Sequence, residues 1–128
     1  MATVDVDLPH VKDDDPHHHG PAKGIGRWLF TTNHKDIGSM YLIFSLCMFM
    51  VGGLMALVIR AELFQPGLQL VEPNFFNQMT TMHGLIMVFG AVMPAFVGLA
   101  NWMLPLQIGA PDMALPRMNN WSFWILPF

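Results

Sequence analysis

TTMHGLIMVFG, the stretch from Thr80 to Gly90, places one histidine, His83, inside a long uncharged apolar run. A polar ring costs free energy in hydrocarbon unless it finds a partner. An ionisable residue within a membrane span is therefore a candidate for ligand, ion or proton chemistry. The fold class depends on how far the apolar run around His83 extends in each direction.

Charged residues are few and unevenly placed. Only 12% of the 128 residues are charged and 53% are hydrophobic, whereas globular proteins carry roughly 25% charged residues. No Asp, Glu, Lys or Arg occurs between Ile37 and Ile59 or between Pro73 and Pro111. A helix needs about 20 apolar residues to cross a bilayer, and buried helices of soluble proteins are rarely so long and so free of charge. The sequence predicts an all-α transmembrane protein rather than an unusually apolar soluble core.

The overall charge gives no sign of nucleic-acid binding. The formal net charge of −3 comes largely from an acidic N-terminal tail, and the chain has no basic patch of the kind that nucleic-acid-binding proteins carry. Cys47 is the only cysteine, so no disulfide can form within the chain. The lipid bilayer is the partner that the composition predicts.

Charge, proline and aromatic positions divide the chain into consecutive segments. They are a flexible tail (1–26), an interfacial segment (27–36), a transmembrane helix (37–60), an outer loop (61–77), a second, antiparallel transmembrane helix (78–104), an inner loop (105–120) and the start of a third transmembrane helix (121–128), which we expect to be truncated. Lys23, Arg27 and Lys35 precede the first span, whereas the following loop carries Glu62 and Glu72. The positive-inside rule therefore predicts a cytoplasmic N-terminus.

His83 and Arg60 are expected at similar depths near the outer face. Counting from the outer end of the second span, His83 lies roughly 8 to 11 Å inside it, and Arg60 ends the first span. The two side chains could face one large anionic, metal-bearing ligand between the helices. Alternatively, Arg60 snorkels to the headgroups and the Gly, Ala and Met residues near His83 pack helices together. Pro94 is expected to disturb the second helix locally.

A polar cluster is expected at the inner end of the helices. Asp112 is the only acidic residue after Glu72, and Asn101 and Asn119 lie on either side of it in the sequence. A carboxylate that takes protons from water, beside carboxamides that order water, suits a proton-uptake port. In the alternative, Asp112 pairs with Arg117 and the asparagines cap the next helix.

Two further polar groups have simple interpretations. Before the first span, His34 and Lys35 are interpreted as headgroup and helix-start contacts. In the outer loop, Glu62, Gln65 and Gly67 offer a carboxylate and turn oxygens that could hold a calcium or sodium ion. The alternative for that loop is an ordinary tight surface turn around Pro66.

Several motifs together carry a family resemblance. They are RWLFTTNHKDIG at 27–38, RAEL at 60–63, QPG at 65–67, MHG at 82–84, IGAPDMA at 108–114 and PRMNN at 116–120. They closely resemble subunit I of the haem–copper cytochrome c oxidases, from residue 27 to the end of the chain. The resemblance implies the N-terminal part of a twelve-helix bundle that passes electrons from cytochrome c to O2 and pumps protons.

The resemblance also implies roles for individual residues. His83 would be one axial ligand of the low-spin haem a, and Arg60 would hydrogen-bond the formyl group of that haem. Asp112 would be the entry of a proton-uptake channel in which Asn101 and Asn119 order water. The implied peripheral calcium or sodium site comprises Glu62, Gln65 and Gly67.

Other parts of the implied oxidase are expected outside this chain. A low-spin haem needs a second axial ligand, and the oxygen-reducing centre needs histidines for a high-spin haem a-type group and for copper B. The 128 residues alone are therefore expected to be inactive. Expected partners are oxidase subunits II and III, cytochrome c, O2 and the lipid bilayer. A bacterial inner membrane is favoured over a mitochondrial one.

Two other functions stay open on the sequence. The first is subunit I of a quinol-oxidising relative, because the regions that recognise the electron donor lie mainly outside this chain. The second is a stand-alone, non-enzymatic membrane protein with two helices.

Overall fold

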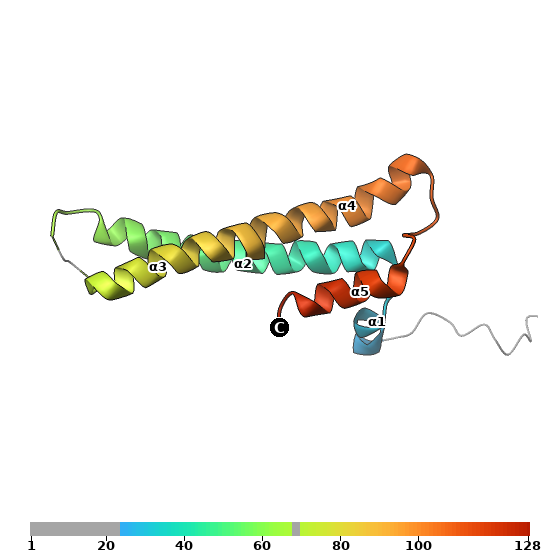
Figure 1. The fold of residues 1–128 in the computed structure, drawn as a ribbon, viewed down its shortest axis with the longest axis horizontal. Coiled ribbons are helices and arrows are strands. Elements are labelled where there is room, and N and C mark those ends of the chain that lie inside the picture. The colour runs from blue at the N-terminus through green and yellow to red at the C-terminus, as the bar shows by residue number, and fades with distance from the viewer. Residues whose placement is uncertain (1–23, 68–69) are drawn as a thin grey trace, which may run out of the picture.

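A computed structural model describes residues 24–67 and 70–128, and Figure 1 shows their arrangement. The first 23 residues of the predicted tail lie outside the described residues. Every regular element in the described part is a helix, in the order α1 (Ile25–Leu29), α2 (His34–Glu62), α3 (Pro73–Leu85), η1 (Ile86–Val92), α4 (Met93–Ile108) and α5 (Pro116–Ile125). The predicted all-α fold is confirmed.

The helix α2 is one long rod of 29 residues that contains the predicted span 37–60. It begins earlier than predicted because the Asn33 side chain caps it, accepting a hydrogen bond of 3.1 Å from the backbone N–H of Lys35. Asp36 in its first turn and Arg60 in its last turn both suit the helix dipole.

The second rod runs back along α2 and is built from α3, η1 and α4 in continuous succession (Figure 1). Pro73 starts it at a position where a missing N–H costs nothing. Gly109 ends it with a left-handed φ of 70°. The predicted span 78–104 lies within this rod. The rod extends beyond the predicted span at both ends, because Pro73 starts it before residue 78 and Gly109 ends it after residue 104.

Glycines let the two rods approach closely. A Cβ atom on Gly38 would lie 2.9 Å from the carbonyl oxygen of Gly98, and one on Gly98 would lie 3.0 Å from that of Gly38. Farther along, a Cβ on Gly90 would lie 3.1 Å from Met48. Side chains of α2, Met48 and Leu42, therefore fill the space beside Gly90 and Gly98.

The buried core lies at one end of the rods, where α5 packs against α2. It consists of Ile37, Met40, Tyr41 and Phe123, and the Tyr41 and Phe123 rings meet edge to face with centroids 5.0 Å apart. Elsewhere the rods expose apolar side chains. Only 11% of the most apolar part of α2 and 17% of that of the second rod is buried. Soluble core helices would be mostly buried, so both rods are membrane-span candidates by length, composition and exposure.

Candidate functional site

His83 lies half-buried in the last turn of α3, facing α2. Its Nδ1 atom lies 2.9 Å from the carbonyl oxygen of Gly52. A carbonyl oxygen can only accept, so the ring must donate from Nδ1, and in the neutral ring Nε2 then carries the lone pair. Within the described residues Nε2 has no hydrogen-bond partner. Histidines that bind metals typically hold their second ring nitrogen in this way, with a backbone carbonyl fixing the tautomer and the ring orientation.

Gly52 makes this contact possible because it brings no side chain between the two helices. It is buried, and a Cβ atom added to it would lie 2.5 Å from Sδ of Met87. The neighbouring Gly53 and Gly84 differ, because a Cβ added to either would meet nothing within 4 Å. The surface beside His83 therefore includes backbone without side-chain cover, which a flat ligand could approach.

A π-helical segment, η1, follows directly after His83. The backbone N–H of Met93 donates to the carbonyl of Val88, five residues earlier. The Ser45 hydroxyl of α2 donates to the Ala91 carbonyl at 2.6 Å in a buried contact, and so supports this segment from the neighbouring rod. The expected local disturbance is thus present just before Pro94, which has no N–H to donate. π-helical turns are frequent at functional sites.

Arg60 lies beyond His83 along the helix axis, toward the outer end of the first span. It is exposed in the last turn of α2, eight residues beyond Gly52. At 1.5 Å per residue the two α2 positions are about 12 Å apart. Arg60 makes no hydrogen bond or ion pair within the described part of the chain, which leaves its guanidinium group available to a ligand.

Asp112 lies at the other end of the rods, in the loop before α5, and is paired with a histidine. Its Oδ1 atom accepts a hydrogen bond of 2.7 Å from the Met113 backbone N–H and lies 3.1 Å from Nδ1 of His34. His34 is only 6% exposed, and its buried Nε2 has no partner among the described residues. The interpretation of His34 as a headgroup contact was wrong, because the Asn33 cap turns the first residue of α2 inward, against the Asp112 loop.

Asn101 and Asn119 come together, as the predicted cluster requires. The Asn119 side chain donates to Oδ1 of Asn101 at 2.7 Å, and Asn101 is only 2% exposed. No direct hydrogen bond links this pair to Asp112 in the described residues. The inner polar cluster therefore consists of two parts, the His34–Asp112 pair and the Asn101–Asn119 pair.

Two residues that the sequence interpretation missed, Ser122 and Tyr41, link the backbone of Asn119 to the buried core. The exposed Ser122 hydroxyl donates to the backbone carbonyl of Asn119 at 2.7 Å, and the Tyr41 and Ser122 hydroxyl oxygens are 2.9 Å apart. Because Ser122 has only one proton, Tyr41 must be the donor in this contact. Tyr41 is the only tyrosine in the chain and lies within an apolar run, which was a signal that its hydroxyl needs a partner.

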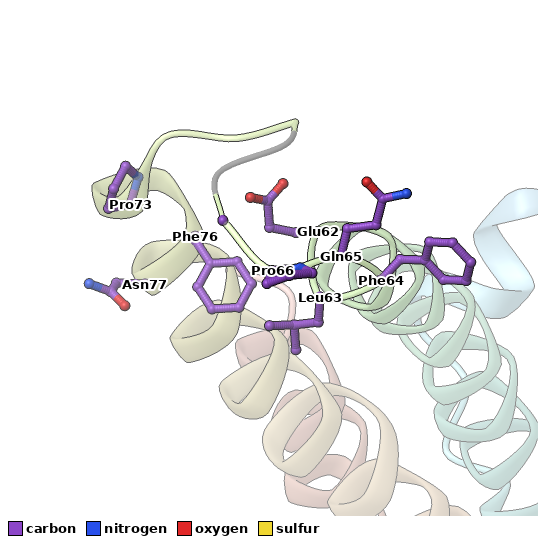
Figure 2. A pocket seen from close by; sticks show the side chains of 9 residues that line it. Glu62, Leu63, Phe64, Gln65, Pro66, Pro73, Phe76 and Asn77 are labelled. Carbon is purple, nitrogen blue, oxygen red and sulfur yellow. The ribbon is translucent and has the colours of Figure 1, made fainter.

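The start of the outer loop and the first turn of α3 line an open cavity of about 510 Å³ at the end of α2. Figure 2 shows Glu62 and Gln65 on the same side of this loop, with the Phe76 ring of α3 nearby. Glu62 is only 5% exposed, and its Oε2 atom accepts backbone hydrogen bonds of 2.6 Å from Leu70 and 3.1 Å from Val71. Gly67 lines the same cavity with a left-handed φ of 102°. Glu62 therefore anchors the loop, and the three predicted cation-site residues share one cavity.

No group of three or more His, Cys, Asp or Glu side chains that could hold a metal ion comes together within residues 24–67 and 70–128. His83 is therefore a candidate metal ligand because of its own hydrogen bond to the Gly52 carbonyl, and not because other such side chains lie beside it.

The fold defines an all-α membrane protein, and comparison with known proteins gives its family. The chain belongs to the family described as "Cytochrome C and Quinol oxidase polypeptide I", which matches residues 36–128. It is 52% identical over 108 residues to a probable cytochrome c oxidase subunit 1-alpha of Streptomyces coelicolor, covering 84% of this chain and 19% of that protein. The resemblance inferred from the motifs is confirmed.

Corynebacterial relatives give the same picture. The cytochrome c oxidase subunit 1 of Corynebacterium glutamicum is 53% identical over 119 residues, which cover 91% of this chain and 20% of that protein. The corresponding protein of Corynebacterium diphtheriae is 54% identical over 108 residues, covering 83% and 19%. The chain thus spans about a fifth of the length of the curated relatives that it matches.

Proposed function

We propose that this chain forms the N-terminal part of subunit I of a cytochrome c oxidase, within a twelve-helix bundle, and supplies one axial ligand of the low-spin haem a. The observation that carries the proposal is the bond from Nδ1 of His83 to the Gly52 carbonyl, which leaves Nε2 free of protein partners in the described residues. When bound, a low-spin haem would supply one-electron transfer.

The residues of this chain fit such a group. His83 offers a nitrogen with a fixed tautomer, Gly53 and Gly84 leave backbone uncovered beside it, and Arg60 offers a cation about 12 Å farther along α2. The guanidinium group is suited to hydrogen-bond a formyl oxygen at the edge of a large ring. We propose that the second axial ligand, and the ligands of the high-spin haem and copper B, lie in other parts of the full subunit.

We further propose that Asp112 takes protons from bulk water at the entry of an uptake channel. Its side chain is 40% exposed, so water reaches the carboxylate, while His34 holds one of its oxygens. Asn101 and Asn119 would order water beyond it, and their direct hydrogen bond supports a shared role. The Ser122 and Tyr41 hydroxyls continue this polar row from the backbone carbonyl of Asn119.

The remaining site proposal concerns the outer loop. Glu62, Gln65 and Gly67 are proposed to hold a peripheral calcium or sodium ion, because they line one cavity and offer the oxygen ligands that hard cations prefer. Glu62 also holds the loop backbone, so ion binding and loop structure would be coupled.

Cytochrome c is proposed as the electron donor and O2 as the acceptor, with proton pumping coupled to turnover. The family description covers both cytochrome c and quinol oxidases, whereas the relatives named above are cytochrome c oxidases, which favours that branch over a quinol oxidase. Family membership likewise favours an oxidase over a stand-alone, non-enzymatic protein. Subunits II and III are the proposed protein partners, in a bacterial inner membrane, and the chain alone is proposed to be inactive.

The haem proposal is tested by replacing His83 with alanine in the intact oxidase complex. His83→Ala removes the ligand nitrogen, so the absorption of the low-spin haem should be lost while the complex still assembles. Thr81→Ala is the matched control on the same helix, because Thr81 is exposed and its hydroxyl only bonds the Asn77 carbonyl. An unchanged low-spin spectrum in assembled His83→Ala protein would refute the assignment.

A further inference from the structure

One side of α2 carries a continuous stripe of side chains that no proposed site uses. Lys35, Ser39, Leu42, Leu46 and Phe49 follow at alternating spacings of four and three residues, which places them on one helical face. The apolar part of the stripe borders a groove of about 300 Å³ between the two rods, lined by Leu42, Ser45, Leu46, Phe49, Ala91, Val92 and Ala95.

The groove is apolar and accessible. Leu46 is 62% exposed, and Val92, on the opposite rod, is 47% exposed. Ser45 is the only polar side chain of the lining, and its hydroxyl is already bonded to the Ala91 carbonyl. The groove therefore suits a hydrocarbon occupant and offers nothing to a polar one.

At one end of the stripe, the ammonium group of Lys35 lies over the aromatic ring of Trp102. Nζ of Lys35 lies 5.7 Å from the centroid of the Trp102 ring, and the Trp102 N–H donates to the Ser39 hydroxyl at 3.2 Å. The edge of the same ring packs on Gly38, where an added Cβ would lie 2.8 Å from its Cδ1 atom. Trp102 is thus held between the rods, beneath the ammonium group.

The charge of Lys35 is not neutralised by a carboxylate in the described residues. Its neighbour Asp36 is bonded to Arg27 at 3.1 Å, and Asp112 is paired with His34. Lys35 is exposed and makes no ion pair there. An anion is therefore the complementary partner at this end, and tryptophan is the residue type that typically lies at the level of the lipid headgroups.

The spacing between the cation and the groove matches one leaflet. Ten residues separate Lys35 from Ser45, which corresponds to about 15 Å of helix. Half of a hydrocarbon core that is about 30 Å thick is also about 15 Å. An acyl chain that starts at the level of Lys35 and Trp102 would therefore reach the groove.

We propose that this face binds an anionic glycerophospholipid of the surrounding membrane, with its phosphate group at Lys35 and one acyl chain in the groove beside Leu46. The uncompensated lysine selects anionic over zwitterionic headgroups, and the apolar groove takes the chain. The proposal rests on the proposed function, because it takes this face of α2 to be lipid-facing in the full subunit, but it uses neither the His83 nor the Asp112 assignment.

Native mass spectrometry of the purified, intact oxidase complex titrated with phosphatidylglycerol tests the headgroup contact. Lys35→Gln should lose one retained phosphatidylglycerol per complex, and Lys35→Arg should keep it. Arg117→Gln is the matched control, because Arg117 is also an exposed cation but lies on α5. Equal retention of phosphatidylglycerol by Lys35→Gln and the parent complex, or equal retention of phosphatidylcholine and phosphatidylglycerol by the parent, would overturn the proposal.

A photo-reactive phenylalanine analogue at position 46 tests the groove itself. Illumination of the complex in membranes should give an adduct with the mass of a phospholipid. An adduct with another protein segment, or with a second copy of this chain, would show that protein covers the groove and would also overturn the proposal. Elution of the intact complex from a size-exclusion column verifies the assembly of each variant.

Discussion

Gly52 is the residue on which the position of His83 depends most directly. Gly52→Ala would place a Cβ atom 2.5 Å from Sδ and 3.0 Å from Cγ of Met87, which lies one turn after His83. Overpacking of this kind costs about 1 kcal/mol where, as here, a flexible methionine side chain can move away. We expect a lower midpoint of thermal denaturation and less bound haem in the purified complex.

The neighbouring glycine gives a matched control for this substitution. An added Cβ at Gly53 meets nothing within 4 Å, and alanine in a helix interior is favoured over glycine by roughly 0.5–1 kcal/mol. Gly53→Ala should therefore leave the haem content and the midpoint unchanged or slightly raised. Equal losses in both variants would mean that contact with Met87 is not what matters at Gly52.

Asp112 allows a test of proton uptake that leaves the haem ligand intact. Asp112→Asn keeps the size of the side chain but removes the carboxylate that would take up protons from water. Proton uptake by the reconstituted oxidase should slow strongly, while the haem absorption stays the same. Glu72→Gln, an exposed carboxylate in the outer loop, should behave as the parent. Normal turnover of Asp112→Asn would exclude Asp112 from the uptake route.

At the scale of the element, the π segment η1 depends on a hydroxyl from the other rod. Ser45→Ala removes the donor of the 2.6 Å bond to the Ala91 carbonyl and leaves that buried oxygen without this partner. The expected cost is about 1–3 kcal/mol, measured as a lower denaturation midpoint in detergent. Thr80→Ala removes a comparable hydroxyl that bonds the Phe76 carbonyl on an exposed face, and should change little. Similar midpoints for the two variants would contradict a structural role of Ser45.

The elements themselves were largely predictable, whereas the contacts between them were not. Two charge-free runs predict two rods, because burying charge in hydrocarbon is costly. Their exact ends depend on a cap by Asn33 and on Pro73 and Gly109, whose effects the hydropathy pattern does not contain. The π hydrogen bonds of η1 left no local signal except the nearby Pro94.

The same limit applies to the candidate site. The chemical types of His83, Asp112, Asn101 and Asn119 were enough to select them, because polar groups in apolar surroundings need partners. The Gly52 carbonyl could not be predicted as the partner of His83, since it is a backbone group 31 residues away on another helix. His34 was misassigned for the same reason, because its partner Asp112 lies 78 residues later in the chain.

At the scale of the whole molecule, the proposed orientation can be measured by labelling. The positive-inside rule places the outer loop outside the cell and the α4–α5 loop in the cytoplasm. In a Cys47→Ser background, Phe64→Cys should react with a membrane-impermeant maleimide in intact cells, whereas Leu115→Cys should react only after the membrane is opened. Phe64 lies in the outer loop and Leu115 in the α4–α5 loop, and both side chains are exposed within the chain. The reverse pattern would show that the orientation is inverted.

The uninterrupted α2 helix takes part in the proposed haem site and the proposed proton-uptake site, because it supplies Tyr41 to the inner polar row and Gly52 to His83. Gly52 lies eleven positions after Tyr41 in regular helix without proline, which corresponds to about 16.5 Å along the axis and a fixed rotation about it. The distance between the proposed haem site at His83 and the polar row proposed for proton uptake is therefore set by the geometry of one helix and not by the length of a loop. Loop sequences can change freely during evolution without altering that separation, whereas an insertion or deletion within this segment of α2 would move one site relative to the other.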